Sequence, residues 1–391
     1  MRIQRYWLLV FLFFAAGLYF FYQVNQPFLS YDFAPQFDGN DYRGIYEYFT
    51  GMTGAYKVPF PFNGRLLVPW LASLVGTGDI IWDFRAVNLL FTLLGVFMLF
   101  ELWRTLGFER HWFLFGMAWL CFHWTGLIRL NAFDPITVDV PTYFFQALLL
   151  WLVLKRRFVW LLLLGPIATL QKESIIGVLA VIALFGFLHN RKAKDGFFDQ
   201  KWILLAFVLS YASKLLIGHF FPPAEAGKGA FITLAYHAKE ALLHPFEFVR
   251  WAMAAFVAFG PILLVGLSRL RLRGHYDMKR MLLLSCSSLY LAYGILAGGD
   301  MTRIIFLGFP FIMTWLIYEL KELPRPRVWL LAILSLPLTF LVSHIPDPAF
   351  SWDVWESWYP EFASPRVIGL YGLYALLCGL LMAFANKRGL T

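Results

Sequence analysis

The chain has 391 residues, of which 60% are hydrophobic and 15% charged, and it contains 42 Phe and 16 Trp. A soluble globular domain does not need so many large apolar side chains, so the composition predicts a polytopic membrane protein. The net charge of +9 would suit a nucleic-acid partner, but the distribution of the basic residues gives another explanation below. Cys121, Cys286 and Cys378 lie inside apolar runs, which is typical of small buried side chains and not of disulfides or zinc ligands.

Apolar stretches of about 20 residues predict an all-helical transmembrane bundle of about twelve spans. The first stretch, 6–24, has no Ala-x-Ala cleavage site after it and is typical of an uncleaved signal anchor. Other spans are expected at 86–103, 112–128, 139–154, 202–221, 248–268, 281–297, 304–320, 328–344 and 366–385. Residues 158–189 are interrupted by a polar segment at 171–174, which predicts a hairpin of two short spans. Three segments too short to span are expected to lie at the membrane interface, namely 65–75, 234–246 and 352–362.

The basic residues assign sides to the loops. With both termini in the cytoplasm, the inner segments hold 21 of the 33 Lys and Arg residues but 7 of the 24 acidic ones. This asymmetry agrees with the positive-inside rule and explains the net charge without a nucleic-acid partner. We therefore expect one integral membrane domain over 1–391 in a bacterial inner (cytoplasmic) membrane. Residues 25–85 would form its first outer loop, with juxtamembrane helices and without a soluble domain.

Two carboxylates stand three residues apart in this first outer loop. Residues 37–42 read Phe-Asp-Gly-Asn-Asp-Tyr, so Asp38 and Asp41 flank a glycine that permits a tight turn. Charged side chains beside a membrane are costly, and either carboxylate is a candidate general base for an acceptor hydroxyl. The alternative is an Asx turn with both carboxylates in water.

Polar side chains also cluster at the outer junction of the third and fourth spans. Arg129, Asn131, Asp134 and Asp139 lie there, and Asp134 precedes a proline that favours a helix start. A helix N-cap is therefore an alternative role for Asp134. Asp139 lies about one turn further on and is expected to point into the bundle.

Two later turns add charged candidates. Lys172 and Glu173 lie at the apex of the predicted hairpin, where a helix break is tolerated if it faces protein or a wet cavity. Residues 298–303, Gly-Gly-Asp-Met-Thr-Arg, form a short outer turn in which Arg303 is suited to bind an anion. Simple neutralisation of neighbouring charges is the alternative for both pairs, Lys172 with Glu173 and Asp300 with Arg303.

The remaining acidic residues and the histidines suggest no further site. The acids expected to meet water in interfacial loops are Asp79, Asp83, Glu225, Glu240, Glu247 and those of 347–361. The outer histidines have no metal-ligand spacing, and they are His219, His237, His244 and His344. No metal site is therefore predicted, no cofactor is expected, and the question of a divalent metal stays open.

Taken in order, these motifs resemble those of the GT-C-fold glycosyltransferases, polytopic enzymes that take sugars from polyprenyl-phosphate carriers. Those families carry an acidic motif, Asp-Glu-x-x-Tyr or a variant, in the first outer loop. Residues 38–42 match its Asp and Tyr but have Gly39 where many members have Glu. Residues 61–72 resemble the proline-rich, arginine-containing entry to a juxtamembrane helix in bacterial members.

The later motifs fit the same resemblance. Asp134 and Asp139 occupy a loop in which such enzymes often carry a second acidic residue. Residues 169–173 resemble a break between two short helices, and 298–303 are similar to a recurrent later-loop pattern. The resemblance covers most of the chain in layout. It departs from the many members that end in a soluble outer domain.

The resemblance implies an inverting hexosyl or pentosyl transfer at the outer face. Asp38 would act as general base, with Asp41, Asp134 and Asp139 as alternatives or orienting groups. The groups implied in binding the donor are Arg65, Arg129, Lys172, Glu173, Asp300 and Arg303. The implied partners are a polyprenyl-phosphate-linked sugar, membrane lipids and an unidentified acceptor.

Two other classes are compatible with a many-spanned chain. A transporter or flippase for a lipid-linked sugar or anion would use the broken hairpin as its midplane site. The charged residues gather on one predicted face, however, and no inverted repeat is visible. A polysaccharide polymerase or acyltransferase would be expected to carry a large late outer loop, and residues 221–247 form only a modest one.

Overall fold

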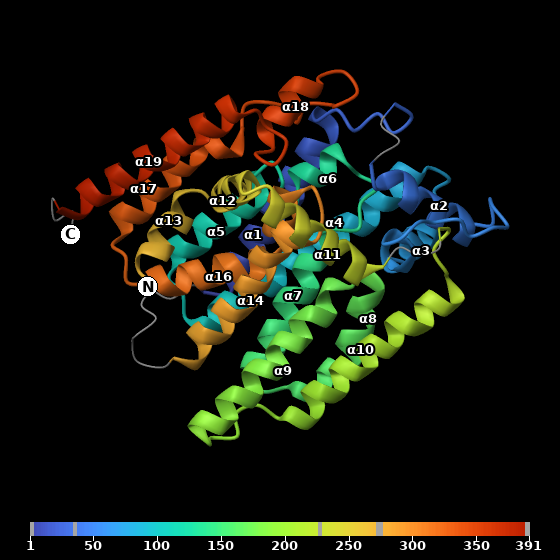
Figure 1. Cartoon of the computed structure of the whole chain (residues 1–391), viewed down its shortest axis with the longest axis horizontal. Coiled ribbons are helices and arrows are strands. Elements are labelled where there is room, and N and C mark those ends of the chain that lie inside the picture. The colour runs from blue at the N-terminus through green and yellow to red at the C-terminus, as the bar shows by residue number, and fades with distance from the viewer. Residues whose placement is uncertain (1–3, 34–36, 226–228, 271–276, 388–391) are drawn as a thin grey trace.

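The protein is described by a computed structural model that covers residues 4–33, 37–225, 229–270 and 277–387 (Figure 1). This described part is all-helical, with 74% helix and no strand. The first helices are α1 Tyr6–Asn25, α2 Gly39–Phe49, α3 Leu67–Val75, α4 Ile80–Leu106, α5 Arg110–Phe122, α6 Arg129–Phe133 and α7 Val140–Leu154. Next come α8 Leu161–Gln171, α9 Ser174–Ala193, α10 Gln200–Phe220, α11 Ala230–Leu243, α12 Phe246–Phe259 and α13 Pro261–Ser268. The last are α14 Met278–Leu296, α15 Met301–Leu307, α16 Phe309–Leu320, α17 Arg325–Ser335, α18 Trp352–Trp358 and α19 Pro365–Lys387. Short 3-10 turns lie at Phe62–Gly64 (η1), Phe158–Trp160 (η2) and Leu336–Thr339 (η3).

Five of the described helices are long and apolar enough to cross a membrane, namely α1, α4, α9, α10 and α19. Two bent pairs raise this number to seven, if each pair is one span: α11 with α12, bent by 110°, and α15 with α16, bent by 70°. The prediction of an all-helical protein is confirmed, and several of its helices could span a membrane. The bundle of about twelve spans is not confirmed.

Helix length explains part of the difference. α5 has 13 residues and α7 has 15, which corresponds to about 20 to 23 Å of helix against a hydrocarbon core of about 30 Å. The span expected at 248–268 is interrupted at Gly260, whose φ of 68° is unfavourable for residues with a side chain, and Pro261 then starts α13. Within the span expected at 328–344, the helix α17 ends at Ser335, and the short turn η3, which contains Pro337, follows it.

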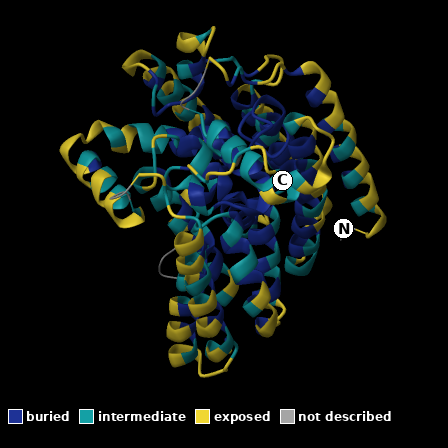
Figure 2. Cartoon of the chain, turned by 90° about the vertical axis from the view of Figure 1, so that its right-hand side faces the viewer, coloured by how far each residue is buried: buried dark blue, intermediate teal, exposed yellow. Residues whose placement is uncertain are grey.

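The core is built around α4, which packs against α1, α3 and α7. Large aromatic side chains fill it, and Trp103 of α4 donates a hydrogen bond from Nε1 to Oγ1 of Thr314 on α16 at 2.8 Å. Figure 2 shows that buried residues gather in the middle of the molecule, whereas the peripheral helices expose their outward faces. Exposed Leu, Val and Phe side chains on α1, α10 and α19 suit contact with lipid.

The predicted hairpin is present as α8 and α9, which are separated only by Lys172 and Glu173. Both helices pack against α10, and the three lie together at one end of the molecule (Figure 1). The short segments predicted to lie at the interface are also helical, as α3, α11 and α18. The break between α8 and α9 brings two charged residues close to the start of α2 and α15, where the candidate site lies.

Candidate functional site

Arg303, on α15, connects three carboxylates that are far apart in the sequence. Its Nη2 lies 2.9 Å from Oδ2 of Asp38, its Nε lies 2.6 Å from Oδ2 of Asp139, and its Nη1 lies 3.2 Å from Oδ2 of Asp300. Asp38 immediately precedes α2, Asp139 precedes α7, and Asp300 precedes α15. One guanidinium group therefore joins the beginnings of three helices.

Asp139 is fully engaged by cations. Its second oxygen, Oδ1, accepts a hydrogen bond from Nζ of Lys172 at 2.6 Å, and its side chain is only 4% exposed. Burial alone would raise the pKa of Asp139, but the charges of Arg303 and Lys172 outweigh burial and hold this pKa below its usual range. Asp139 is therefore ionised and has no oxygen left without a cationic partner, so we assign it to positioning Lys172 and Arg303.

A second ion pair lies beside this cluster. Arg65 donates from Nε and Nη2 to the two carboxylate oxygens of Glu173, at 3.3 and 2.9 Å, and from Nη1 to the Tyr42 hydroxyl at 2.9 Å. Burial would raise the pKa of Glu173, but the Arg65 charge and its hydrogen bonds lower it to about 2. This bidentate pair fixes the hairpin apex against the segment between η1 and α3.

The two ion-pair systems open into one cavity of about 610 Å³. Among the sequence-predicted residues, its walls include Asp38, Arg65, Lys172, Glu173, Asp300 and Arg303. Aromatic side chains of the loop before α3 and of two helices add to the walls, namely Phe60, Phe62, Tyr211, Tyr290 and Tyr293. Charged groups next to aromatic rings suit a ligand that combines a polar part with apolar surface.

Lys214 of α10 also lines this cavity, and sequence reasoning did not select it. Lys214 lies within the apolar stretch that was expected to span the membrane at 202–221, and only the outer loops were searched for charged residues. A signal was present, because an isolated cation within an apolar span is costly and tends to face a cavity.

Besides Asp139, two more of the predicted aspartates lie outside the cavity walls. The Oδ1 atom of Asp134 accepts a hydrogen bond from the Tyr31 hydroxyl at 2.6 Å, and burial raises the pKa of Asp134 to about 7. Asp41 lies in the first turn of α2, and burial together with the Asp38 charge raises its pKa to about 6. Both carboxylates are close enough to influence the site electrostatically.

Arg129 is placed elsewhere. Its side chain is fully buried, and its guanidinium donates to the backbone carbonyls of Phe122, Thr339, Phe340 and Ser343. Arg129 thereby joins the end of α5 to the segment that follows η3, where the Phe340 carbonyl also accepts a hydrogen bond from the Ser343 N–H at 3.0 Å. The structure therefore gives Arg129 a structural role and does not bring it to the cavity.

The expectation that Asp83 and Glu361 meet water is wrong. Asp83 is 0% exposed and accepts hydrogen bonds from the Tyr46 hydroxyl at 2.7 Å and from the Thr77 hydroxyl at 2.7 Å. Glu361 is 5% exposed and accepts from the backbone N–H and the hydroxyl of Thr302, at 2.9 and 2.7 Å. Glu361 thus holds the residue that precedes Arg303.

The Glu361 contact predicts a pH-dependent stability. Burial raises the pKa of Glu361 from 4.5 to about 8, so the folded protein keeps a proton that the unfolded chain has lost between these values. The stability that Glu361 contributes is fully present below about pH 4.5 and is lost as the pH rises through about 8. Between about pH 4.5 and 8 the unfolding midpoint of the wild type should fall relative to that of Glu361→Gln. The variant should therefore be the relatively more stable of the two at higher pH.

Thermal unfolding in one detergent at a series of pH values between about 5 and 9 measures this effect. Asp353→Asn is the matched control, because Asp353 is an exposed carboxylate on the neighbouring α18. Parallel pH profiles for the wild type and Glu361→Gln would contradict the assignment.

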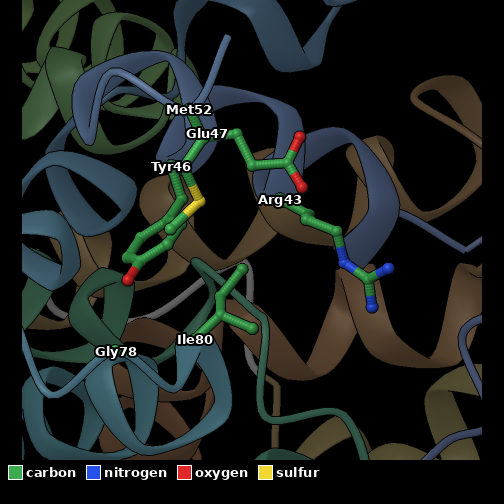
Figure 3. A pocket seen from close by; sticks show the side chains of 6 residues that line it. All are labelled: Arg43, Tyr46, Glu47, Met52, Gly78 and Ile80. Carbon is green, nitrogen blue, oxygen red and sulfur yellow. The ribbon is translucent and has the colours of Figure 1, made fainter.

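A smaller cavity of about 270 Å³ lies between α2 and the start of α4 (Figure 3). Its walls are Arg43, Tyr46, Glu47, Met52, Gly78 and Ile80, none of which was a predicted site residue. Within the described residues, no cluster of three or more His, Cys, Asp or Glu side chains is arranged to hold a metal ion.

No protein-family model, no curated protein and no solved structure matches this chain.

Proposed function

We propose that this protein is a membrane glycosyltransferase that transfers a sugar from a polyprenyl-phosphate carrier to an acceptor hydroxyl. The observation that carries the proposal is the position of Asp38, which faces a large cavity while one of its oxygens contacts Arg303. The side chain of Asp38 is 25% exposed, so a substrate can reach it, in contrast to Asp139 at 4%. Aromatic walls suit a sugar ring, and the cations suit a phosphate.

In the proposed reaction Asp38 takes the proton of the acceptor hydroxyl. The acceptor oxygen forms a bond to the anomeric carbon of the sugar, while the bond from that carbon to the phosphate oxygen breaks. The electron pair of the broken bond leaves with the polyprenyl phosphate, and the configuration at the anomeric carbon is inverted. Cations around the cavity stabilise the negative charge that grows on the phosphate, and the fixed helix starts position Asp38.

The distribution of Lys and Arg favours a cavity on the outer face of a bacterial inner membrane, with both termini in the cytoplasm. The helices that line the cavity include α10, which is long and apolar enough to span. A donor embedded in the membrane therefore has the cavity within reach of its headgroup.

Reconstitution into proteoliposomes tests the proposal. Polyprenyl-phosphate hexoses and pentoses are supplied with a mixture of candidate acceptors, and two quantities are measured: release of polyprenyl phosphate and movement of the intact donor across the bilayer. We expect release of polyprenyl phosphate with inversion at the anomeric carbon.

The bent pair of α15 and α16, beside the break between α8 and α9, also favours a second candidate, since discontinuous helices line the central sites of many transporters. Movement of intact lipid-linked sugar, without its consumption, would support this transporter or flippase and refute the transferase.

A further inference from the structure

We propose that Lys214 of α10 forms a subsite of the main cavity for a phosphate group. This inference rests on the proposed function, because it names the residue that holds the phosphate of the donor. The sequence alone assigned that role to Arg129, which the structure places away from the cavity, and to Arg65, Lys172 and Arg303. The structure shows that these three cations are already bound to carboxylates, and it adds a fourth.

The charges of the three predicted cations are compensated within the protein. Arg303 contacts three carboxylates, Lys172 contacts Asp139, and Arg65 binds Glu173 through two nitrogens. A phosphate approaching any of them also meets the paired carboxylate, whose repulsion offsets much of the attraction. These pairs suit the fixing of helix starts better than the capture of a new anion.

Lys214 differs from them. Among the described residues its ammonium group forms no ion pair, and its nearest aromatic contact is the Phe60 ring, with Nζ 6.0 Å from the centroid. Burial raises the pKa of Glu173, Arg65 lowers it, and the charge of Lys214 lowers it further by a smaller amount. Both carboxylate oxygens of Glu173 accept hydrogen bonds from Arg65, however, and not from Lys214. Lys214 is therefore the lining cation with the most capacity for an external anion.

The position of Lys214 along α10 makes its charge costly unless the charge has a polar neighbour or a ligand. It lies six residues before the end of the helix at Phe220, about 9 Å inside that end. A cation at this depth is retained where it faces a polar cavity or a ligand. Tyr211, one turn earlier, and Tyr293, on α14, also line the cavity, and their hydroxyls form no hydrogen bond within the described part of the chain. One cation and two free hydroxyls can together bind the oxygens of a phosphate.

The apolar lining of the same cavity indicates the rest of the ligand. Apolar side chains of α11 and α15 lie there, including Leu234, Ile304 and Leu307. A phosphate attached to an apolar chain would place its charged end at Lys214 and its chain along these residues. A free phosphate ion shares the charged end but not this apolar contact, so the two sources can be separated by experiment.

Binding of a radiolabelled polyprenyl phosphate to the purified full-length protein in nanodiscs tests the subsite. Lys214→Gln should weaken this binding by at least about tenfold, which is the loss of one charge-assisted hydrogen bond. Lys214→Arg, which keeps the charge, should retain most of the affinity. Lys201→Gln is the matched control, since Lys201 belongs to the same helix but lies at its other end, over the ring of Trp202.

Two further probes identify the source of the phosphate. A neutral polyprenol of the same length should bind the wild type and Lys214→Gln equally, which also shows that the variant is folded. Competition by inorganic phosphate as strong as that by polyprenyl phosphate would assign the subsite to free phosphate, whereas weak competition assigns it to the lipid.

Equal affinity of the wild type and Lys214→Gln for polyprenyl phosphate would overturn the subsite, even if sugar transfer is observed. Conversely, a charge-dependent affinity at Lys214 without any sugar transfer would leave the subsite intact while the proposed function fails.

Discussion

Replacing Asp38 with asparagine should lower the rate of sugar transfer by roughly 100- to 10,000-fold, the usual contribution of a general base. The amide has nearly the same shape as the carboxylate, and its oxygen can still accept the hydrogen bond from Nη2 of Arg303. It cannot take a proton from an acceptor hydroxyl. The expected loss is therefore in the rate at saturating donor, with expression and thermal stability close to those of the wild type.

Two other aspartates of the same segment provide the comparison. Asp32 is 86% exposed and 3.7 Å from Arg43, so Asp32→Asn should leave transfer unchanged. Asp41 is the strongest alternative base, because burial and the Asp38 charge raise its pKa to about 6, but it does not line the cavity. The initial rate of polyprenyl phosphate release measures all three variants. Full activity of Asp38→Asn, with loss of activity in Asp41→Asn, would move the general base to Asp41.

The convergence of Asp38, Lys172 and Arg303 could be predicted from the sequence, because the charge asymmetry predicted that their loops share one side. Side-chain direction could not be predicted in this way. Arg129 lies in a loop on the same predicted side, yet its guanidinium turns into the protein and binds backbone carbonyls. Lys214 was not selected for a different reason: hydropathy averaged over an apolar stretch does not register one charged residue.

The long apolar helices could be predicted closely, and α10 and α19 begin and end within two residues of their expected bounds. Breaks within apolar stretches could not, because hydropathy sums over a window and does not register a change of direction. Gly260 adopts a φ of 68°, and Gly308 separates α15 from α16 where the pair bends by 70°. These local backbone conformations lower the number of full-length spans.

Replacing Arg303 with alanine should destabilise the protein by about 3–5 kcal/mol, the usual cost of removing one partner from a buried ion pair. The side chain of Arg303 is 11% exposed and that of Asp139 is 4% exposed, so water cannot fully replace the lost contacts. Lys172 would remain as a cation beside Asp139, but Asp38 and Asp300 would lose the group that joins them to α7. Sugar transfer should be lost as well, because Asp38 would no longer be held in place.

Unfolding by denaturing detergent gives the free energy, and two matched variants separate the possible causes of its loss. Arg325→Ala also removes an arginine, but its side chain is 62% exposed and lies 3.7 Å from Glu109, so it should cost less than about 1 kcal/mol. Arg303→Lys keeps the charge but cannot bridge three carboxylates, so it should fall between Arg303→Ala and the wild type. If Arg303→Ala were as stable as Arg325→Ala, packing alone would hold the three helix starts together. Arg303 would then be available to a ligand, and the assignment of the phosphate to Lys214 would lose its main support.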